Sequence, residues 1–352
     1  MPPGARTPRF WGSRGPLAWA VLPLAALYAA IVGLRRRAYL HGWLRSQRLG
    51  VAVIVVGNRL AGGTGKTPTV IEIVQHLQSW GWRTGIVSRG FGRQGEAVRE
   101  LHPEDRARDV GDEPLLIARR TGAPVVVGRD RPAAGLELLR RHPDIQVVVC
   151  DDGLQHLRLA RDLEVVVFDE RGLGNGWPLP AGPLRESATA PSGARHQWVV
   201  YNAPAPSTPL PGFLQTRTLS ALLPLARWRA GDQTATMDEA VRTLSACAGV
   251  WAVAGVAVPD KFFAALTSLG LRFTPRALPD HDPWRDWPWP PGVEHVVTTE
   301  KDAVKIDAQA LARERPGTQV WVACLGSQIE ASFWLALRRA LEELAAPPAT
   351  SA

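Results

Sequence analysis

Lysine, cysteine and methionine are scarce in this 352-residue sequence, and its first 50 residues contain no acidic side chain. The three cysteines are widely spaced and each lies in an apolar stretch, which is typical of buried thiols in a reducing cytosol. No Cys/His spacing suggests a zinc site, and no internal repeat is evident. The sequence therefore does not indicate a disulfide-rich, zinc-binding or repeat protein.

The basic charge is concentrated at the N-terminus. With 45% apolar and 21% charged residues, the composition is ordinary for a globular protein, and the length suffices for two domains. The formal net charge of +8 equals the eight arginines of the first 50 residues, while the remaining 33 basic and 33 acidic residues cancel. Because the high isoelectric point is local, we expect no nucleic-acid partner.

An apolar run, Leu17–Leu34, lies between these arginines and would reach about 27 Å as a helix, just short of a typical bilayer core. The sequence does not decide between a helix that crosses the membrane and a helix that lies on it and is anchored by Arg35–Arg37. The run could also be a cleaved signal peptide or a buried core helix. We predict a membrane anchor over residues 1–45, and the arginine bias would leave the body of the protein cytoplasmic.

From residue 51, short apolar strands alternate with helices. This pattern predicts a parallel sheet covered by helices on both faces, with ligands at the carboxyl ends of the strands. We assign residues 46–225 to this domain. The expected strands are Val51–Val56, Thr84–Ser88, Pro124–Gly128, Ile145–Cys150 and Leu163–Asp169, and the expected helices are Pro68–Trp80, Glu113–Arg120 and Ala133–Arg141.

A proline-rich stretch, Ala203–Pro211, interrupts this rhythm, and a second alternation follows. It predicts a smaller α/β domain over residues 226–335, with a surface loop at Asp280–Pro291. Its expected elements are the strands Gly249–Val256, His295–Thr298 and Gln319–Leu325 and the helix Asp260–Leu269. An amphipathic helix, Ile329–Leu344, is expected to close the chain, so that residues 336–352 form the end of that helix and a disordered tail.

The sequence Gly-Gly-Thr-Gly-Lys-Thr at Gly62–Thr67 follows the first apolar strand directly. Such a loop turns backbone N–H groups toward phosphates, Lys66 can reach the β- and γ-phosphates, and Thr67 can hold Mg²⁺. Only four of the 41 basic residues are lysines, and a phosphate loop needs this compact ammonium. The full pattern has a glycine where Leu60 stands, and a glycine-rich turn without a ligand is the alternative. We predict ATP binding by Leu60, Ala61, Gly62, Gly63, Thr64, Gly65, Lys66 and Thr67.

Acidic and basic residues follow the other strands of the same sheet. Asp151 and Asp152 come after a strand, where they can orient Mg²⁺ or cap a helix. Asp112 and Glu113 precede a helix, where an acid can be a cap or a general base for a substrate hydroxyl. Arginines that suit an anionic substrate end two more strands, namely Arg89, Arg129 and Arg131.

Seven motifs in this order resemble the tetraacyldisaccharide 4'-kinase family, over roughly residues 20–340. Together they are far more specific than the phosphate loop alone. They are Gly-Gly-Thr-Gly-Lys-Thr-Pro (62–68), Ser-Arg-Gly-Phe-Gly (88–92), Gly-Asp-Glu-Pro (111–114), Asp-Asp-Gly-Leu-Gln-His (151–156), Leu-Pro-Ala-Gly-Pro-Leu-Arg-Glu (179–186), Pro-Asp-His (279–281) and Thr-Thr-Glu-Lys-Asp-Ala-Val-Lys (298–305).

The resemblance implies a P-loop kinase that uses ATP and Mg²⁺ to phosphorylate the 4'-hydroxyl of an acylated glucosamine disaccharide 1-phosphate. The substrate stays in the bilayer, so the enzyme would work on the cytoplasmic face of a bacterial inner membrane, in contact with its lipid and as a monomer. Asp112 would be the base, assisted by His281 from the second domain across a closing cleft, with Lys66 on the phosphates. Thr67, Asp151, Asp152 and Glu186 would surround Mg²⁺, and Arg89, Gln155, His156 and Arg185 are substrate candidates. The role of Lys301 stays open.

Two different protein classes share some of these features. A membrane-recruited ATPase switch of the partition and targeting type uses the same glycine core, but it usually carries a lysine where this chain has Ala61. It also needs fewer residues after the linker. A membrane adaptor with a vestigial loop is disfavoured because Lys66 and Thr67 are both intact.

Overall fold

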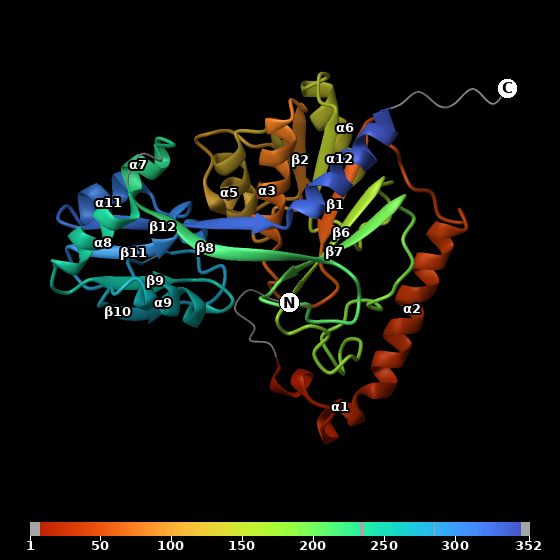
Figure 1. Cartoon of the computed structure of the whole chain (residues 1–352), viewed down its shortest axis with the longest axis horizontal. Helices are drawn as coiled ribbons and strands as arrows, with labels where there is room; N and C mark the ends of the chain where they lie inside the picture. Colours follow the sequence, from red (N-terminus) through yellow and green to blue (C-terminus); the bar gives the residue numbers. More distant parts are fainter. Residues whose placement is uncertain (1–7, 233–235, 285, 346–352) are drawn as a thin grey trace.

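The computed structural model describes residues 8–232, 236–284 and 286–345, which form one twelve-stranded sheet with helices packed around it (Figure 1). The tail predicted at the C-terminus lies, from residue 346, outside the described residues. The strands in sheet order are β10 (Thr274–Ala277), β9 (Trp251–Ala254), β11 (His295–Thr299), β12 (Gln319–Ile329), β8 (Phe213–Pro224), β7 (His196–Asn202), β6 (Leu163–Asp169), β1 (Ala52–Gly57), β5 (Val147–Asp151), β2 (Thr84–Ser88), β4 (Val125–Val127) and β3 (Arg99–Glu100).

Two parallel blocks make up the sheet, together with β3, which pairs antiparallel with β4 at one edge. Strands β8, β7, β6, β1, β5, β2 and β4 are parallel neighbours, and so are β10, β9, β11 and β12. The blocks meet where β12 and β8 pair antiparallel, with an irregularity between Cys324 and Leu325. Because β8 pairs with both β7 and β12, a single strand joins the two halves. The boundary at residues 225/226 stays a prediction.

Helices cover both faces of the larger block. On β1, Ile54 and Val56 belong to the core that packs under α3 and α5, while Val53 and Val55 belong to the core under α6. Because both faces of β1 are buried, the strand is an uninterrupted run of valine and isoleucine from Val53 to Val56. The helices are α1 (Pro16–Ala20), α2 (Leu22–Leu40), α3 (Lys66–Ser79), α4 (Ala107–Val110), α5 (Asp112–Thr121), α6 (Arg131–Arg141), α7 (Leu225–Arg229), α8 (Met237–Ser245), α9 (Pro259–Ser268), α10 (Glu300–Ala303), α11 (Ala308–Glu314) and α12 (Ala331–Ala345), after a 3₁₀ turn at Arg9–Gly12.

The expected mixed α/β fold with a largely parallel sheet is confirmed, and β2 and β6 have the predicted bounds. Helix α3 begins at Lys66, two residues before the predicted start, because left-handed Gly65 (φ 79°) already turns the chain into the helix. Strands β3, β7, β8 and β10 were not predicted. All four residues of β10 are exposed at the sheet edge, so it carries no apolar pattern.

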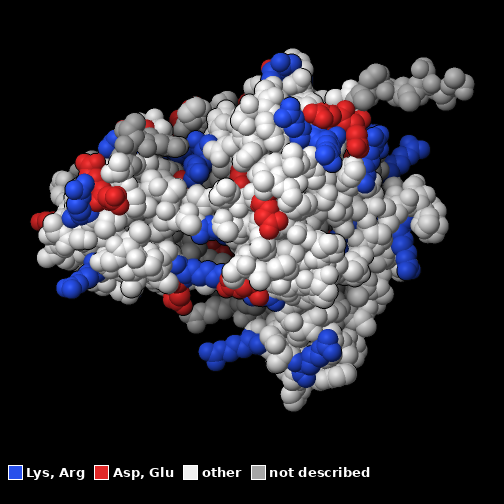
Figure 2. Space-filling view, viewed as in Figure 1, with Lys and Arg blue, Asp and Glu red and all other residues white. Residues whose placement is uncertain are grey.

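The N-terminal apolar run is split between α1 and α2. Four side chains of α2, namely Leu24, Leu27, Ile31 and Leu34, are between 57% and 63% exposed, so the alternative of a buried core helix is wrong. Among the described residues, no helix has the length and apolarity needed to cross a membrane. Figure 2 shows basic but no acidic side chains over α1 and α2 in this view.

The segment Asp280–Pro291 has no helix or strand among its described residues, as predicted, but it is not simply a surface loop. Trp289 is almost fully buried, and Trp284 and Trp287 pack against the same core. Its aromatic side chains therefore fasten the segment to the smaller block. This fixes the chain just after His281.

Candidate active site

One nearby side chain and three from distant parts of the chain bind the carbonyl groups of the phosphate loop. Each of the four consecutive carbonyls of Gly62–Gly65 accepts a hydrogen bond from a different side chain. Fixing these carbonyls leaves the amide N–H groups of the same loop available for an anion, which is how such a loop binds phosphate. The donors, in the same order, are Asn58 Nδ2 (3.0 Å), Arg171 Nη2 (2.6 Å), Asn202 Nδ2 (3.2 Å) and Arg217 Nη2 (2.5 Å).

Gly65 is required where the loop meets α3. Its φ of 79° is left-handed, and a Cβ there would lie 1.7 Å from Arg217 Nη2. The next residue, Lys66, is the first of α3, and its Nζ lies 3.4 Å from Asp152 Oδ1. The lysine therefore stands between the helix N-terminus and the acidic pair, where negatively charged phosphates would bind.

The two aspartates at the end of β5 have opposite electrostatic environments. Burial, with the charges of Glu113 and Asp152, raises the pKa of Asp151 to about 7. For Asp152, burial opposes ionisation, but Lys66 and Arg185 outweigh it and lower the pKa to about 2. Ser88 Oγ donates to Asp151 Oδ2 at 2.9 Å, whereas the buried Asp151 Oδ1 has no hydrogen-bond partner among the described residues. A buried, unpartnered carboxylate oxygen fits a nearby cation.

No group of three or more His, Cys, Asp or Glu side chains within the described residues could hold a metal ion by itself. This arrangement suits Mg²⁺, which usually binds one or two carboxylates and completes its shell with substrate phosphates and water. Thr67, in the first turn of α3, and the Asp151/Asp152 pair fit that description. The assignment of the metal ligands stays a prediction.

The predicted base and its assistant meet across the two blocks. His281 Nδ1 lies 3.0 Å and 2.9 Å from the two carboxylate oxygens of Asp112. Asp112 is the first residue of α5, after Gly111, whose φ is 97° and whose Cβ would lie 3.1 Å from the Gly90 backbone. Gly111 therefore lets the α5 N-terminus approach the Ser-Arg-Gly-Phe-Gly turn closely, and the Phe91 ring of that turn contacts His281.

Cations keep Asp112 ionised. Its burial alone would raise the pKa, but the hydrogen bond with His281 and the charges of Lys301 and Lys305 hold the pKa well below its usual range. Lys305 Nζ lies 3.7 Å from Asp112 Oδ2 and 2.9 Å from the fully buried Asp302 Oδ1. The carboxylate of Asp112 thus lies within a positive cluster supplied by the smaller block.

Lys301, whose place the sequence leaves open, belongs to this cluster. Its Nζ lies 3.0 Å from Asp280 Oδ1, 3.3 Å from Glu113 Oε1 and 3.2 Å from His281 Nε2. Burial would lower the pKa of Lys301, but the carboxylates of Glu113, Asp112 and Asp280 raise it above its usual value. Lys301 therefore stays charged beside the Asp112–His281 pair and also joins α10 to α5.

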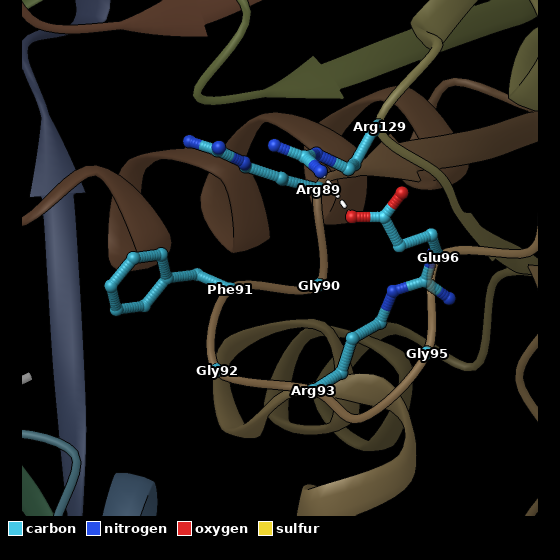
Figure 3. A pocket seen from close by; sticks show the side chains of 8 residues that line it. All are labelled: Arg89, Gly90, Phe91, Gly92, Arg93, Gly95, Glu96 and Arg129. Atoms are coloured by element: carbon cyan, nitrogen blue, oxygen red, sulfur yellow. Dashed lines mark hydrogen bonds and ion pairs between the residues drawn. The ribbon is translucent and has the colours of Figure 1, made fainter. Parts of the chain in front are cut away.

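Arginines gather at the ends of β2 and β4. Figure 3 shows that the side chains of Arg89 and Arg129 extend in the same direction and that Arg129 pairs with Glu96. These residues and Arg93 line a cavity of about 280 Å³. Burial and the charges of Arg131 and Arg129 lower the pKa of Arg89. The mutual repulsion of these arginines is relieved by an anion, as expected at a phosphate or anionic-sugar site.

The remaining substrate candidates also lie near the acidic pair. Arg185 Nη1 is 3.7 Å from Asp152 Oδ1, and Gln155 Nε2 donates to Glu186 Oε1 at 3.0 Å. Burial, with the charges of Arg131 and Arg89, lowers the pKa of His156 to about 4, so its imidazole is neutral at pH 7. Glu186 is buried and its second oxygen binds Arg36 at 2.6 Å.

Sequence reasoning missed several residues that build the site. Arg171, Asn202, Arg217 and Lys305 carried no role in the prediction, although Lys305 stood within a motif that marks the family. Arg36 was predicted to anchor the helix on anionic lipid together with Arg35 and Arg37, but it is 4% exposed and pairs with Glu186 instead. The scarcity of lysine was the one signal that could have drawn attention to Lys305. The others act through contacts with residues far along the chain, which no local pattern reveals.

Comparison with known proteins now decides the family. The model of the tetraacyldisaccharide-1-P 4'-kinase family matches residues 17–342. The tetraacyldisaccharide 4'-kinase of Methylibium petroleiphilum is 53% identical and covers 95% of this chain and 92% of its own, and that of Leptothrix cholodnii is 51% identical and covers 96% of each. The chain belongs to the tetraacyldisaccharide 4'-kinase family.

A solved structure supports the same assignment at the level of the fold. The crystal structure of LpxK from Aquifex aeolicus in complex with ATP has a TM-score of 0.75 and 27% identity, and the match covers 92% of this chain and 99% of that one. The tetraacyldisaccharide 4'-kinase family consists of ATP-dependent kinases of lipid A biosynthesis, so a partition-type ATPase switch is not favoured.

Proposed function

We propose that this kinase transfers the γ-phosphate of ATP to the 4'-hydroxyl of tetraacyldisaccharide 1-phosphate at the cytoplasmic face of the bacterial inner membrane. The observation that carries the proposal is the contact between Asp112 and His281. Glu113, the neighbour of Asp112, is close enough to Asp151 to raise its pKa, which supports one continuous site. The proposed site uses groups of one chain, so the proposal requires no second subunit.

In the proposed reaction, the 4'-hydroxyl oxygen attacks the γ-phosphorus in line, and the bond from that phosphorus to the β,γ-bridging oxygen breaks. The hydroxyl proton passes to the Asp112–His281 pair, with Asp112 as base and His281 as its assistant. Lys66 would contact the β- and γ-phosphates from the start of α3. Lys301 and Lys305 hold the pair in position and keep Asp112 ionised.

Mg²⁺, when bound, would neutralise charge on the transferred phosphate. Thr67, Asp151 and Asp152 are proposed to hold it, and the unpartnered Asp151 Oδ1 supports this role. Glu186 is the fourth predicted ligand, but each of its oxygens already accepts a hydrogen bond, one from Arg36 and one from Gln155. It would have to exchange the Gln155 contact to reach a metal.

Arg89 and Arg185 are proposed to bind the 1-phosphate of the acceptor, with Gln155 and the neutral His156 as hydrogen-bonding partners for sugar or phosphate. Its acyl chains would stay in the bilayer, beside the exposed apolar side chains of α2. Fractionation with high salt or carbonate tests the membrane contact, because retention under high salt and release by carbonate is expected of a helix that lies on the surface.

The transfer itself is tested with γ-labelled ATP, Mg²⁺, the full chain in mild detergent and tetraacyldisaccharide 1-phosphate, with Asp112→Ala as a control. Label in the lipid with the wild type, and its loss in the control, is the expected result. Release of free phosphate without lipid labelling would instead favour the ATPase switch.

A further inference from the structure

Helix α2 has two faces with different surroundings. Leu24, Leu27, Ile31 and Leu34 recur at a spacing of three and four residues, which places them on one face, and all are well exposed. We call these four side chains the apolar stripe. A second face of the helix carries Tyr28, Arg35 and Arg36, which make hydrogen bonds with the body of the protein.

Arg36 is the most deeply buried of these three residues. Its side chain is 4% exposed although it belongs to a surface helix. Nη2 lies 2.6 Å from Glu186 Oε2, and Nη1 donates to the carbonyl of Pro191 at 2.5 Å. Arg37, the next residue, is exposed, so the two neighbouring arginines of one helix have different surroundings.

The partners of this face are the residues predicted to build the site. Tyr28 Oη donates to the carbonyl of Arg185 at 2.9 Å, and Arg35 Nη1 donates to the carbonyl of Gln155 at 3.2 Å. Together with Arg36, these side chains of α2 therefore reach the same wall, formed by Gln155, Arg185 and Glu186, which we call the site wall.

The site wall is joined in turn to the phosphate-binding residues. Gln155 Nε2 bridges Glu186 Oε1 and the carbonyl of Asn58, and Asn58 holds the phosphate loop. The backbone N–H of Arg185 donates to the carbonyl of Arg59, next to Leu60 of that loop. A continuous set of hydrogen bonds thus runs from α2 to the ATP-binding loop.

We propose that Arg36 is a positioning residue through which α2, when its apolar stripe lies on an anionic lipid surface, orders the site wall and the phosphate loop. The proposal rests on the membrane contact of the proposed function. A buried carboxylate is held in place by the cation it pairs with, and Arg36 is the nearest cation to Glu186, so the place of Glu186 depends on the place of α2. Because binding free energies are reciprocal, a lipid surface that fixes α2 tightens ATP binding, and ATP tightens binding to the surface.

The test measures the affinity of the full chain for a fluorescent ATP analogue with Mg²⁺, with and without phosphatidylcholine vesicles that contain phosphatidylglycerol. No acceptor is added. For the wild type we expect vesicles to tighten nucleotide binding about fivefold, at the low end of usual couplings. Arg36→Met should bring this ratio close to one. Arg276→Met removes the same charge from the exposed edge strand β10, outside the site and the N-terminal helix, and should keep the wild-type ratio.

Two further variants keep the test decisive if Arg36→Met folds poorly. Tyr28→Phe removes only the hydroxyl that binds Arg185 and should reduce the ratio without loss of thermal stability. Arg36→Lys keeps the charge but cannot make both hydrogen bonds of the guanidinium, so its ratio should lie between those of Arg36→Met and the wild type. Equal ratios in wild type, Arg36→Met and Tyr28→Phe would overturn the proposal.

Vesicle flotation separates this failure from failure of the proposed function. If the wild type floats with the vesicles but its nucleotide affinity does not change, the membrane contact stands and the coupling is refuted. If it does not float, both the membrane contact and the coupling are refuted. Lipid labelling in detergent tests the kinase activity separately from either outcome.

Discussion

His281 Nδ1 lies 2.9 Å from Asp112 Oδ2, although 169 positions separate the two residues in the chain. Asp112 begins a helix of the larger parallel block, while His281 belongs to the smaller one. The pair therefore exists only when the two blocks are close together, so the proposed proton transfer would depend on their approach.

Replacing His281 by alanine should lower turnover and leave ATP binding nearly intact, because the ring contacts Asp112 and Phe91 rather than the phosphate loop. We expect a loss in kcat of about 10²-fold to 10³-fold, in the range of one acid–base group. Steady-state kinetics and titration with an ATP analogue measure the two effects. The exposed His102→Ala should change neither, and equal loss of turnover and ATP affinity in His281→Ala would contradict the assigned role.

Removing the Lys305 charge should move the acid limb of activity to higher pH. Cations favour the ionised carboxylate, so Lys305→Met raises the pKa of Asp112 from its lowered value, and the base is lost sooner as the pH falls. The expected displacement of the kcat/KM profile is about one pH unit. Lys261→Met, which breaks only an exposed pair with Glu170, is the control. A Lys305→Met profile that overlays the wild type would exclude this electrostatic role.

Arg217 should matter for ATP although it is not in the phosphate loop. Its guanidinium is buried and donates to Gly65, and burial lowers its pKa to about 10, so it remains charged at neutral pH. Losing a hydrogen bond to a charged donor costs about 1.5–3 kcal/mol, so Arg217→Met should weaken ATP binding about tenfold to a hundredfold. Calorimetry measures this, with the exposed Arg276→Met as control. Unchanged affinity would mean that the loop keeps its shape without this contact.

Stability should depend on pH through His156. Its pKa is about 4 in the folded chain and about 6.5 when unfolded, so the unfolded chain binds more protons between these values. The contribution of His156 is thus fully present above pH 6.5 and is lost as the pH falls through 4. Urea unfolding at pH 7.5 and 5 should show a smaller decline for His156→Asn than for wild type, whereas the exposed His102→Asn should decline like wild type. An equal decline in His156→Asn would contradict this assignment.

The sequence predicts the larger block well because its strands are buried on both faces and consist of unbroken apolar runs, as in β1 and β4. It does not predict β8, where exposed and buried residues are mixed, since that strand is defined by its partners β7 and β12. The same distinction holds for the site. Motifs point to Asp112, Asp151 and His281, whereas Arg36 and Arg217 act across about 150 positions and leave no local pattern.

The buried Arg36 also bears on how the protein can be handled in the laboratory. An exposed apolar helix at one end of a chain is a natural target for deletion when a more soluble version is wanted. Deleting residues 1–45 would remove the 2.6 Å partner of Glu186 and leave that buried carboxylate with Gln155 and a guanidinium 3.9 Å away, on Arg59. A more soluble derivative would better keep the helix and replace Leu24, Leu27 and Ile31 by polar residues, so that solubility is gained while Arg36 stays in place.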